Sequence, residues 1–275
     1  MAVGPAQRAS YANDHHTKIP FETAPRHLAG PGDPRHVTHA LLAAGWTLTS
    51  APGDPRIALT GPDEARHQMV IDPFASGSWW RIRSVDWTWY ASFDRMVPAE
   101  IIAGFTDRLL EGPRRGDAGP WERMEAAGWT VDRHPDGAGQ AHSPDPHPIL
   151  VELRPISGDV PDRLAWRIQA DPEHGGPPIW GTWISGSVPD HLMAGLVEQL
   201  VSTAPVLRGM HDLDHYGARQ NPSPLTSEQA VEAHFTRIDA ARARARSRRR
   251  TRLTAHLPTP AAALPSRASS RAPRP

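Results

Sequence analysis

The sequence contains no cysteine, which excludes disulfide bonds and thiolate metal sites. It also lacks any apolar run of the roughly eighteen residues that a membrane-spanning helix requires, and its first ten residues lack the apolar stretch of a signal peptide. Apolar residues make up only 39% of the 275 residues, whereas prolines number 30, a balance that indicates long loops and tails beside a folded core. We therefore expect a cytoplasmic protein of one or two domains with no membrane partner.

The common catalytic and cofactor signatures are missing as well. The chain has no Gly-x-Ser-x-Gly elbow, no Walker-type loop, no Rossmann fingerprint and no His-Glu-x-x-His motif. We expect a protein that is not an enzyme, with no catalytic residues and no cofactor. The acidic residues Asp107 and Glu111 are spaced to lie on one helix and are expected to be ordinary solvated charges.

Fifteen histidines invite a metal hypothesis. His36 and His39 are three residues apart on an expected helix, and His211 and His215 are four residues apart with two aspartates between them. Zinc sites use such spacings but need further ligands that the neighbouring sequence does not supply. We therefore expect surface histidines and no metal site.

One long stretch of the chain occurs twice. Residues 89–105 align without a gap on residues 180–196, an offset of 91 positions. The phrase Ala-Ala-Gly-Trp at 43–46 recurs at 126–129, an offset of 83 positions. Because the offset grows along the chain, the length differences fall in loops, as they do in structural repeats. The sequence therefore predicts a duplicated unit.

Each copy is predicted to contain a helix, five short strands and a second helix. The opening helices span 34–44 and the residues after Pro120, and the closing helices follow Pro98 and Pro189, which suit a first helical turn. Strand composition between turn residues predicts strands at 46–50, 56–60, 66–71, 79–85 and 87–93 in the first copy, and at 129–133, 139–142, 149–154, 164–170 and 179–184 in the second.

The predicted fold is α+β, with two homologous units related by a pseudo-twofold axis and flanked by disordered tails. Each unit is expected to be a curled antiparallel sheet of four to five strands with its C-terminal helix packed on it. The expected segments are a flexible lead-in (1–26), unit one (27–113), unit two (118–205), a linker (206–225), a helix with a basic end (226–250) and a disordered basic tail (251–275).

The duplicated phrases resemble a known family. Ala29-Gly-Pro-Gly-Asp33, Ala43-Ala-Gly-Trp46, Trp79-Trp80-Arg-Ile82 and Val97-Pro-Ala-Glu-Ile-Ile102 are similar to the tandem-repeat domain-of-unknown-function family three hundred and seventeen of streptomycetes and related actinobacteria. The resemblance covers about residues 25–205 and implies a fold and an actinobacterial lineage. It implies no activity and no functional residues, because none is established for the family.

The strand 79–85 carries the first candidate binding residues. Alternation places Trp80 and Ile82 on one face and Trp79, Arg81 and Arg83 on the other. Trp80 and Ile82 recur in the second copy, so their face is expected to be core, and Arg167 repeats Arg81 on the outward face. Arginines beside an aromatic ring on a solvent-facing sheet are typical of single-strand binding. Solvated arginines over a structural tryptophan are the alternative.

The second candidate is the arginine-rich end of the chain. Residues 236–275 hold eleven arginines and one acid, a net charge of +10, which leaves −10 for residues 1–235. Such a segment binds phosphates without sequence preference; alternatively, it folds back on the acidic body or merely solubilises the protein. Its candidate residues are Arg242, Arg244, Arg246, Arg248, Arg249, Arg250 and Arg252.

These patterns favour a non-catalytic binding module associated with single- or double-stranded nucleic acid through the basic tail and the outward sheet faces. The first alternative is an adaptor that holds a protein partner between two acidic units. The second is a small-molecule hydrolase or transferase, which a deep polar pocket between the units would support.

Overall fold

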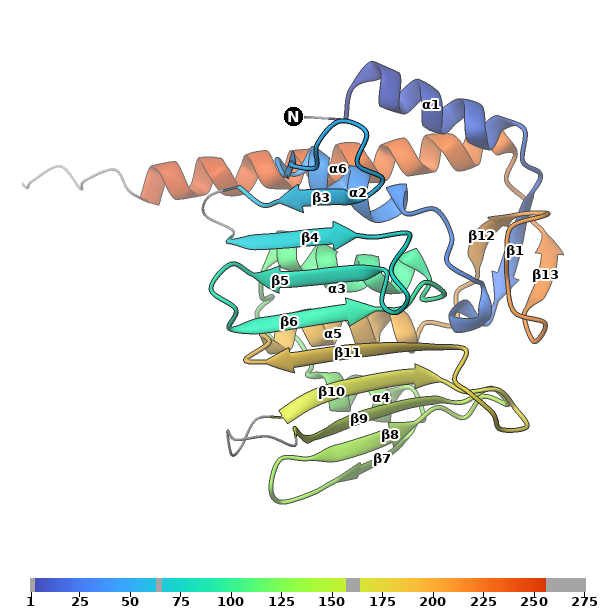
Figure 1. Ribbon diagram of the computed structural model, residues 1–275, viewed down its shortest axis with the longest axis vertical. Helices are drawn as coiled ribbons and strands as arrows, with labels where there is room; N and C mark the ends of the chain where they lie inside the picture. Colours follow the sequence, from blue (N-terminus) through green and yellow to red (C-terminus); the bar gives the residue numbers. More distant parts are fainter. Residues whose placement is uncertain (1–2, 63–65, 157–163, 256–275) are drawn as a thin grey trace, which may run out of the picture.

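The computed structural model describes residues 3–62, 66–156 and 164–255, with side chains up to residue 251. These residues form an α+β fold with one sheet of ten strands and one of three (Figure 1). The ten strands run in the order β2-β3-β4-β5-β6-β11-β10-β9-β8-β7, and every neighbouring pair is antiparallel. Five strands from each predicted unit therefore join in one continuous sheet.

The strands lie within two residues of their predicted bounds. Unit one contributes β2 (Thr47–Leu48), β3 (Ile57–Thr60), β4 (His67–Ile71), β5 (Trp80–Ser84) and β6 (Trp89–Phe93). Unit two contributes β7 (Thr130–Arg133), β8 (Gly139–His142), β9 (Ile149–Pro155), β10 (Leu164–Ala170) and β11 (Trp180–Gly186).

The two units meet where β6 pairs with β11. Ser92 lies opposite Trp183, which is its own equivalent at the offset of 91 positions. Behind this strand pair, the closing helices α3 (Ala99–Glu111) and α5 (Asp190–Leu200) pack against each other. The closest approach involves Gly104 and Gly195, which are again equivalent residues and leave no room for a Cβ atom on either helix.

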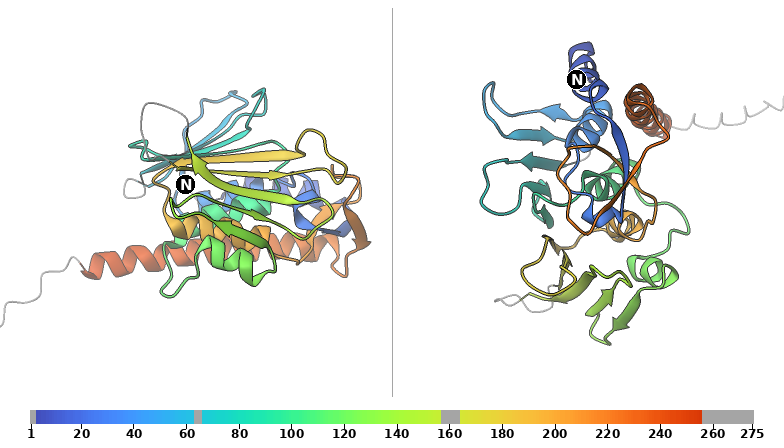
Figure 2. Two further views of the ribbon diagram at one scale, coloured as in Figure 1. Left: turned by 90° about the horizontal axis from the view of Figure 1, so that it is seen from below. Right: turned by 90° about the vertical axis from the view of Figure 1, so that its right-hand side faces the viewer.

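The helices cover one face of the large sheet, and the other face carries no helix of the described residues (Figure 2). The opening helices α2 (Arg35–Ala43) and α4 (Pro120–Ala126) flank α3 and α5. Their inward side chains and those of the sheet form one hydrophobic core, whose largest fully buried members include Trp46, Trp180, Phe93 and Phe105. The predicted inward Trp80 and Ile82 are 3% and 0% exposed, which confirms the alternation on β5.

Local signals fix the ends of the helices. The carboxylate of Asp33 accepts a hydrogen bond from the backbone N–H of Arg35 at 2.8 Å at the start of α2. Gly45, with φ of +99°, follows the end of α2, and Gly112, with φ of +75°, ends α3. These positions require glycine because a Cβ atom would strain the backbone.

The prediction of a flexible lead-in over residues 1–26 is wrong. Residues Pro5–His16 form α1 and Pro20–Ala24 form β1. Tyr11 anchors α1, since its ring stacks on that of His234 with centroids 3.8 Å apart. The N-terminal segment is ordered by a partner more than two hundred residues away, which its own weak periodicity does not reveal.

The segment 206–225, predicted as an irregular linker, contains two strands. β12 (Val206–Gly209) and β13 (Arg219–Pro222) pair with the two edges of β1 and complete the three-stranded sheet at one end of the molecule (Figure 1). Strands of four residues with mixed polarity give little alternation, so this pairing has no strong sequence signal.

The last helix, α6 (Ser227–Ala255), extends five residues past its predicted end. A capping box starts the helix: Thr226 Oγ1 accepts from the N–H of Gln229 at 3.3 Å, and Gln229 Oε1 accepts from the N–H of Thr226 at 2.9 Å. Val231, Ile238 and Ala241 are buried against α1 and α2. The tail predicted to be disordered lies, from residue 256 onward, outside the described residues.

Candidate functional site

The open face of the large sheet is the first candidate region, and it contains the arginines predicted to point outward. We use "open face" for the outward side of the six central strands β4, β5, β6, β11, β10 and β9. Cross-strand pairing puts Arg81, Ser92, Trp183, Arg167 and Glu152 in one row across them. The parallel row includes Arg83, Tyr90, Ser185 and Arg154.

The charge of this face is opposite to that of the body. The six central strands contain four arginines and one glutamate, all on the outward side, a local charge of +3. Glu152 accepts from Arg167 at 3.0 Å, and Arg81 lies 3.5 Å from Asp72 beyond the end of β4. The side chains of Arg81 and Arg167 remain 42% and 37% exposed, so both pairs are open to solvent.

Two arginines of the open face lie over tryptophan rings. The guanidinium of Arg83 is 3.9 Å from the ring centroid of Trp87, which is 65% exposed. Arg154 lies 5.7 Å from the ring centroid of Trp183. At both distances the guanidinium cation and the aromatic ring attract each other.

The predicted Trp79 occupies a different position. Its ring carries Arg95 at 4.8 Å but is half-buried and packs against the hydrophobic core. The aromatic side chains beside the outward arginines are the exposed Trp87 and the half-buried Tyr90 and Trp183, and all three were missed in the sequence analysis. The period-two pattern that places Arg81 outward, applied to the strands β6 and β11, would have found Tyr90 and Trp183.

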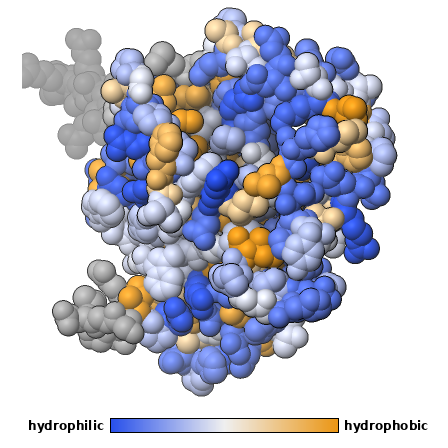
Figure 3. Space-filling view, turned by 45° about the vertical axis from the view of Figure 1, so that its right-hand side comes forward, coloured by the Kyte–Doolittle hydropathy of each residue, from blue (hydrophilic) through white to orange (hydrophobic). Residues whose placement is uncertain are grey.

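The surface that includes the open face in oblique view is mainly hydrophilic (Figure 3). Hydrophobic residues appear there in separate groups among polar ones. A surface of this kind suits a partner that is recognised by charge and ring stacking more than by burial of a large apolar area.

The arginine-rich end of the chain is the second candidate region, and the structure divides its residues. Arg248 donates to the carbonyl oxygen of Leu110, and Arg244 lies 3.5 Å from Glu111, so both contact unit one. Arg242 lies 3.9 Å from Asp239 on its own helix. Arg246, Arg249 and Arg250 are exposed, and the side chain of Arg252 lies outside the described residues.

The expectation that Asp107 and Glu111 are ordinary solvated charges is wrong. Both oxygens of Asp107 accept from Arg237 at 2.9 Å. Burial between α3 and α6 raises the pKa of Asp107, although Arg237 opposes the rise. Glu111 pairs with Arg114 and approaches Arg244. The docking of α6 over α3 places these acids under a basic helix, so part of the arginine-rich segment folds back on the acidic body.

The expectation of surface histidines is also wrong at the first pair. His39 is 4% exposed, and its Nδ1 lies 3.2 Å from Nε2 of His234 on α6. Burial and the neighbouring Arg35 lower the pKa of His39 to about 4. Burial and two nearby histidines lower the pKa of His234 to about 3. Both rings are therefore neutral at neutral pH and act as packing groups between α2 and α6.

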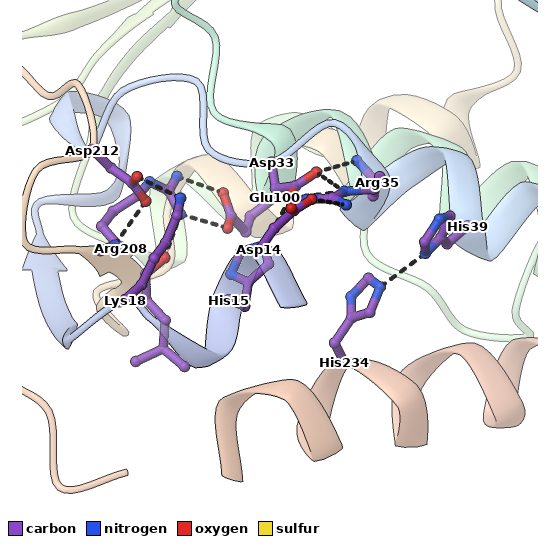
Figure 4. A network of polar contacts seen from close by, with 12 residues as sticks. Asp14, His15, Lys18, Asp33, Arg35, His39, Glu100, Arg208, Asp212 and His234 are labelled. Atoms are coloured by element: carbon purple, nitrogen blue, oxygen red, sulfur yellow. Dashed lines mark hydrogen bonds and ion pairs between the residues drawn. The ribbon is translucent and has the colours of Figure 1, made fainter. Parts of the chain in front are cut away.

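A cavity of about 830 Å³ with several charged residues in its lining is the third candidate region. It lies between α1, the loop before α2, the start of α3, β12 and α6, and Figure 4 shows its charged side chains. Arg208 donates to both oxygens of Glu100, at 2.7 and 2.8 Å. Burial opposes the charge of Glu100, but Arg208 outweighs it and lowers the pKa of Glu100 to about 2.

The charged groups of this cavity satisfy one another. All five N–H groups of Arg208 have acceptors, because the carbonyls of Ala29, Gly30 and Leu207 take the remaining donors. Asp33 accepts from Arg35 and His15, which lowers the pKa of Asp33 against the effect of burial. The network locks the three-stranded sheet to unit one and offers few free donors to a ligand.

Neither the cavity nor the rest of the described chain shows a metal site. Within the described ranges no group of three or more His, Asp or Glu side chains is arranged to hold a metal ion. Of the second predicted histidine pair, His211 is exposed, whereas the ring centroid of His215 lies 5.1 Å from that of His147. Of the helices with described residues, none has the length and apolarity needed to cross a bilayer.

Comparison with known proteins supports the predicted resemblance. Residues 62–115 and 142–206 match the family model described as SPDY, a domain of unknown function (DUF317). The first segment runs from β4 through α3 and the second from the end of β8 through α5, so one match falls in each predicted unit to within two residues. Neither the curated proteins nor the solved structures yield a match.

Proposed function

The chain belongs to the DUF317 family, whose model describes a domain of unknown function. We therefore propose a function from the geometry of the chain itself. The chain is a non-catalytic binding module, and its open face takes up single-stranded nucleic acid. The observation that carries the proposal is the concentration of positive charge, +3, on the six central strands of a body whose first 235 residues sum to −10.

Local charge matters more than total charge for phosphate contact. The Debye length is about 8 Å at physiological ionic strength, so distant acids on the helical side of the sheet are largely screened from a strand on the open face. Arg81, Arg83, Arg154 and Arg167 point to the same side and remain partly exposed. They supply charge-assisted donors to a phosphate backbone.

The aromatic rings supply the second component. Tyr90 and Trp183 lie among these arginines on neighbouring strands, and Trp87 follows at the turn between β5 and β6. Stacking of a base on an aromatic side chain contributes about 1–3 kcal/mol and is tolerant of sequence. We therefore expect a preference for single strands, whose bases are free to stack, over duplexes.

We also infer that a pseudo-twofold axis relates the two units and passes through the middle of the open face. The pairing of Ser92 with its equivalent Trp183 and the contact of Gly104 with its equivalent Gly195 support this inference. Under this symmetry, Arg81 and Arg167 are corresponding residues of two half-sites, about 14 Å apart across three strand spacings. The curl predicted for each half of the sheet remains a prediction.

The test is a fluorescence-anisotropy titration of a labelled single-stranded oligothymidylate with the full chain and with R81A/R167A. Loss of two phosphate contacts is expected to weaken binding by about tenfold and to reduce the slope of log affinity against log salt by about 1.4. The matched control is R114A/R115A, which removes two exposed arginines from the loop after α3, away from the open face. Truncation before α6 is a poorer test, because Val231 and Ile238 of that helix are buried.

A protein partner is the second candidate, and one observation favours it. Arg167 and Arg81 each have a carboxylate neighbour, Glu152 and Asp72, so the face can present mixed charges to a peptide. If the oligonucleotide does not bind, or binds equally well to R81A/R167A and the wild-type chain, the nucleic-acid proposal is wrong and this second candidate takes its place.

A further inference from the structure

A second cavity, of about 400 Å³, lies between unit one and α6. The end of α2, the second half of α3, His67 of β4 and one face of α6 line it. Its volume is within the range of about 300–1,000 Å³ that is usual for small-molecule sites. It is separate from the open face, because α3 and α6 lie on the helical side of the sheet (Figure 2).

The lining of this cavity divides between basic and apolar side chains, with two acids of α3 beside them. Arg244, Arg248 and Arg249 line it from α6, while Leu109 of α3 and Ala245 of α6 contribute apolar surface. This division suits a ligand with a charged head group and an apolar body.

The acidic residues of the cavity do not cancel the three arginines. Both carboxylate oxygens of Asp107 already accept hydrogen bonds from Nη2 of Arg237, and Glu111 already pairs with Arg114. Burial lowers the pKa of His67, so its ring is neutral at neutral pH and adds no charge.

The arginines retain free donors. Arg248 donates one N–H to the carbonyl of Leu110, and Arg244 makes a single long approach of 3.5 Å to Glu111. For Arg249, no hydrogen bond or ion pair is found in the part of the chain that the structure describes. The larger cavity differs, since Arg208 there has an acceptor for every N–H.

We propose that the 400 Å³ cavity binds a small organic anion, with a carboxylate, sulfonate or phosphate group beside Arg248 and Arg249 and an apolar body against Leu109 and Ala245. Charge-assisted hydrogen bonds from guanidinium groups recognise the head group. The ligand bridges α3 and α6, so its binding stabilises the docked position of the arginine-rich helix.

The probe for this site is 8-anilino-1-naphthalenesulfonate, which combines a sulfonate with an aromatic apolar body. Titrated into the full chain, it is expected to bind at one saturable site with enhanced fluorescence. Arg249→Ala is expected to weaken binding by about three- to tenfold, because one charge-assisted donor is lost. Arg246→Ala is the matched control, since Arg246 is an exposed arginine of the same helix that does not line the cavity.

A second pair of variants tests the position of the ligand. Ala245→Trp fills the cavity and is expected to abolish saturable binding, whereas Ala243→Trp adds the same ring to an exposed position of α6 and is expected to leave binding unchanged. Circular dichroism checks that both variants keep their helix. If Ala245→Trp unfolds α6, the comparison of Arg249→Ala with Arg246→Ala still decides, because both side chains are exposed.

Two outcomes would overturn the proposal. Equal weakening by Arg246→Ala and Arg249→Ala would show nonspecific attraction to the basic helix, and displacement of the probe by oligothymidylate would assign these arginines to nucleic acid instead. The test is independent of the open face, because R81A/R167A alters neither wall of the cavity.

Discussion

Replacing Gly104 by alanine is expected to destabilise the junction of the two units. A Cβ atom at this position would lie less than 3.0 Å from the carbonyl oxygen of Gly195 and from Cγ of Gln199. The first of these is a backbone atom, so α3 and α5 must separate to admit the methyl group. The reciprocal change at Gly195 meets the carbonyl of Gly104 and the side chain of Arg108.

Two effects of opposite sign determine the magnitude. Overpacking a tight contact costs about 1–3 kcal/mol and sometimes more. Alanine has the higher helix propensity, which favours the variant by about 1 kcal/mol. Because the clash involves backbone and propagates to the β6–β11 pair beneath, we expect a cost at the upper end of the first range and a net loss of about 1–2 kcal/mol in the free energy of unfolding.

Urea denaturation followed by tryptophan fluorescence measures this loss. The control is Gly77→Ala, where a Cβ atom would have no heavy atom within 4 Å and which is expected to change stability by less than about 1 kcal/mol. The double variant G104A/G195A should cost less than the sum of the two single changes, because one separation of the helices relieves both clashes. If Gly104→Ala instead raises stability by about 1 kcal/mol, propensity alone governs the site and the close packing of α3 on α5 is refuted.

Two further predictions concern buried polar groups. The side chain of Arg108 is 4% exposed and lies 2.7 Å from both Asp117 and Glu198. Arg108→Met removes the positive charge between these two acids, so it should lower the free energy of unfolding, measured by urea titration, by about 2–4 kcal/mol. A loss below about 1 kcal/mol would mean that Arg123, which also pairs with Asp117, neutralises the acids alone. The pKa of His234 in the folded chain, about 3, lies below its unfolded value near 6.5, so the unfolded state binds more protons and stability should fall as the pH is lowered from about 6.5 toward 3. His234→Phe keeps an aromatic ring beside Tyr11 but cannot be protonated, so the loss of stability at low pH should become smaller. Urea midpoints at pH 7 and pH 5 measure this loss. If the variant and the wild-type chain lose the same stability, other groups cause the pH dependence.

The repeated core could be predicted because its signals are local. Trp80 and Ile82 alternate with Arg81 and Arg83, and turn residues bound each strand, so the faces and the bounds follow from a period of two. The duplication then transfers each assignment to the second unit, as it does for Arg167.

The elements outside the repeats could not be predicted, because their signals are distant. β1 pairs with strands that begin at Val206 and Arg219, and α1 is held by Tyr11 against α6. No window of the chain contains both partners of such a contact.

The candidate site follows the same division. The outward position of Arg81 is encoded in its strand, whereas its row with Trp183 depends on the pairing of β6 with β11. Asp107 and His39 read as surface residues on an amphipathic helix until α6 covers them. Both cavities border α6, so neither can be inferred before the docking of that helix is known.

The most direct measurement of the central claim is ultraviolet cross-linking of the full chain to oligothymidylate, with the linked peptides identified by mass spectrometry. The proposal predicts cross-links in β6, in β11 and in the turn between β5 and β6, at or beside Tyr90, Trp183 and Trp87, and these cross-links are lost at high salt. Cross-links confined to α6, or none at all under conditions where a known single-strand binder is labelled, would contradict the claim that the open face of the sheet is the nucleic-acid site.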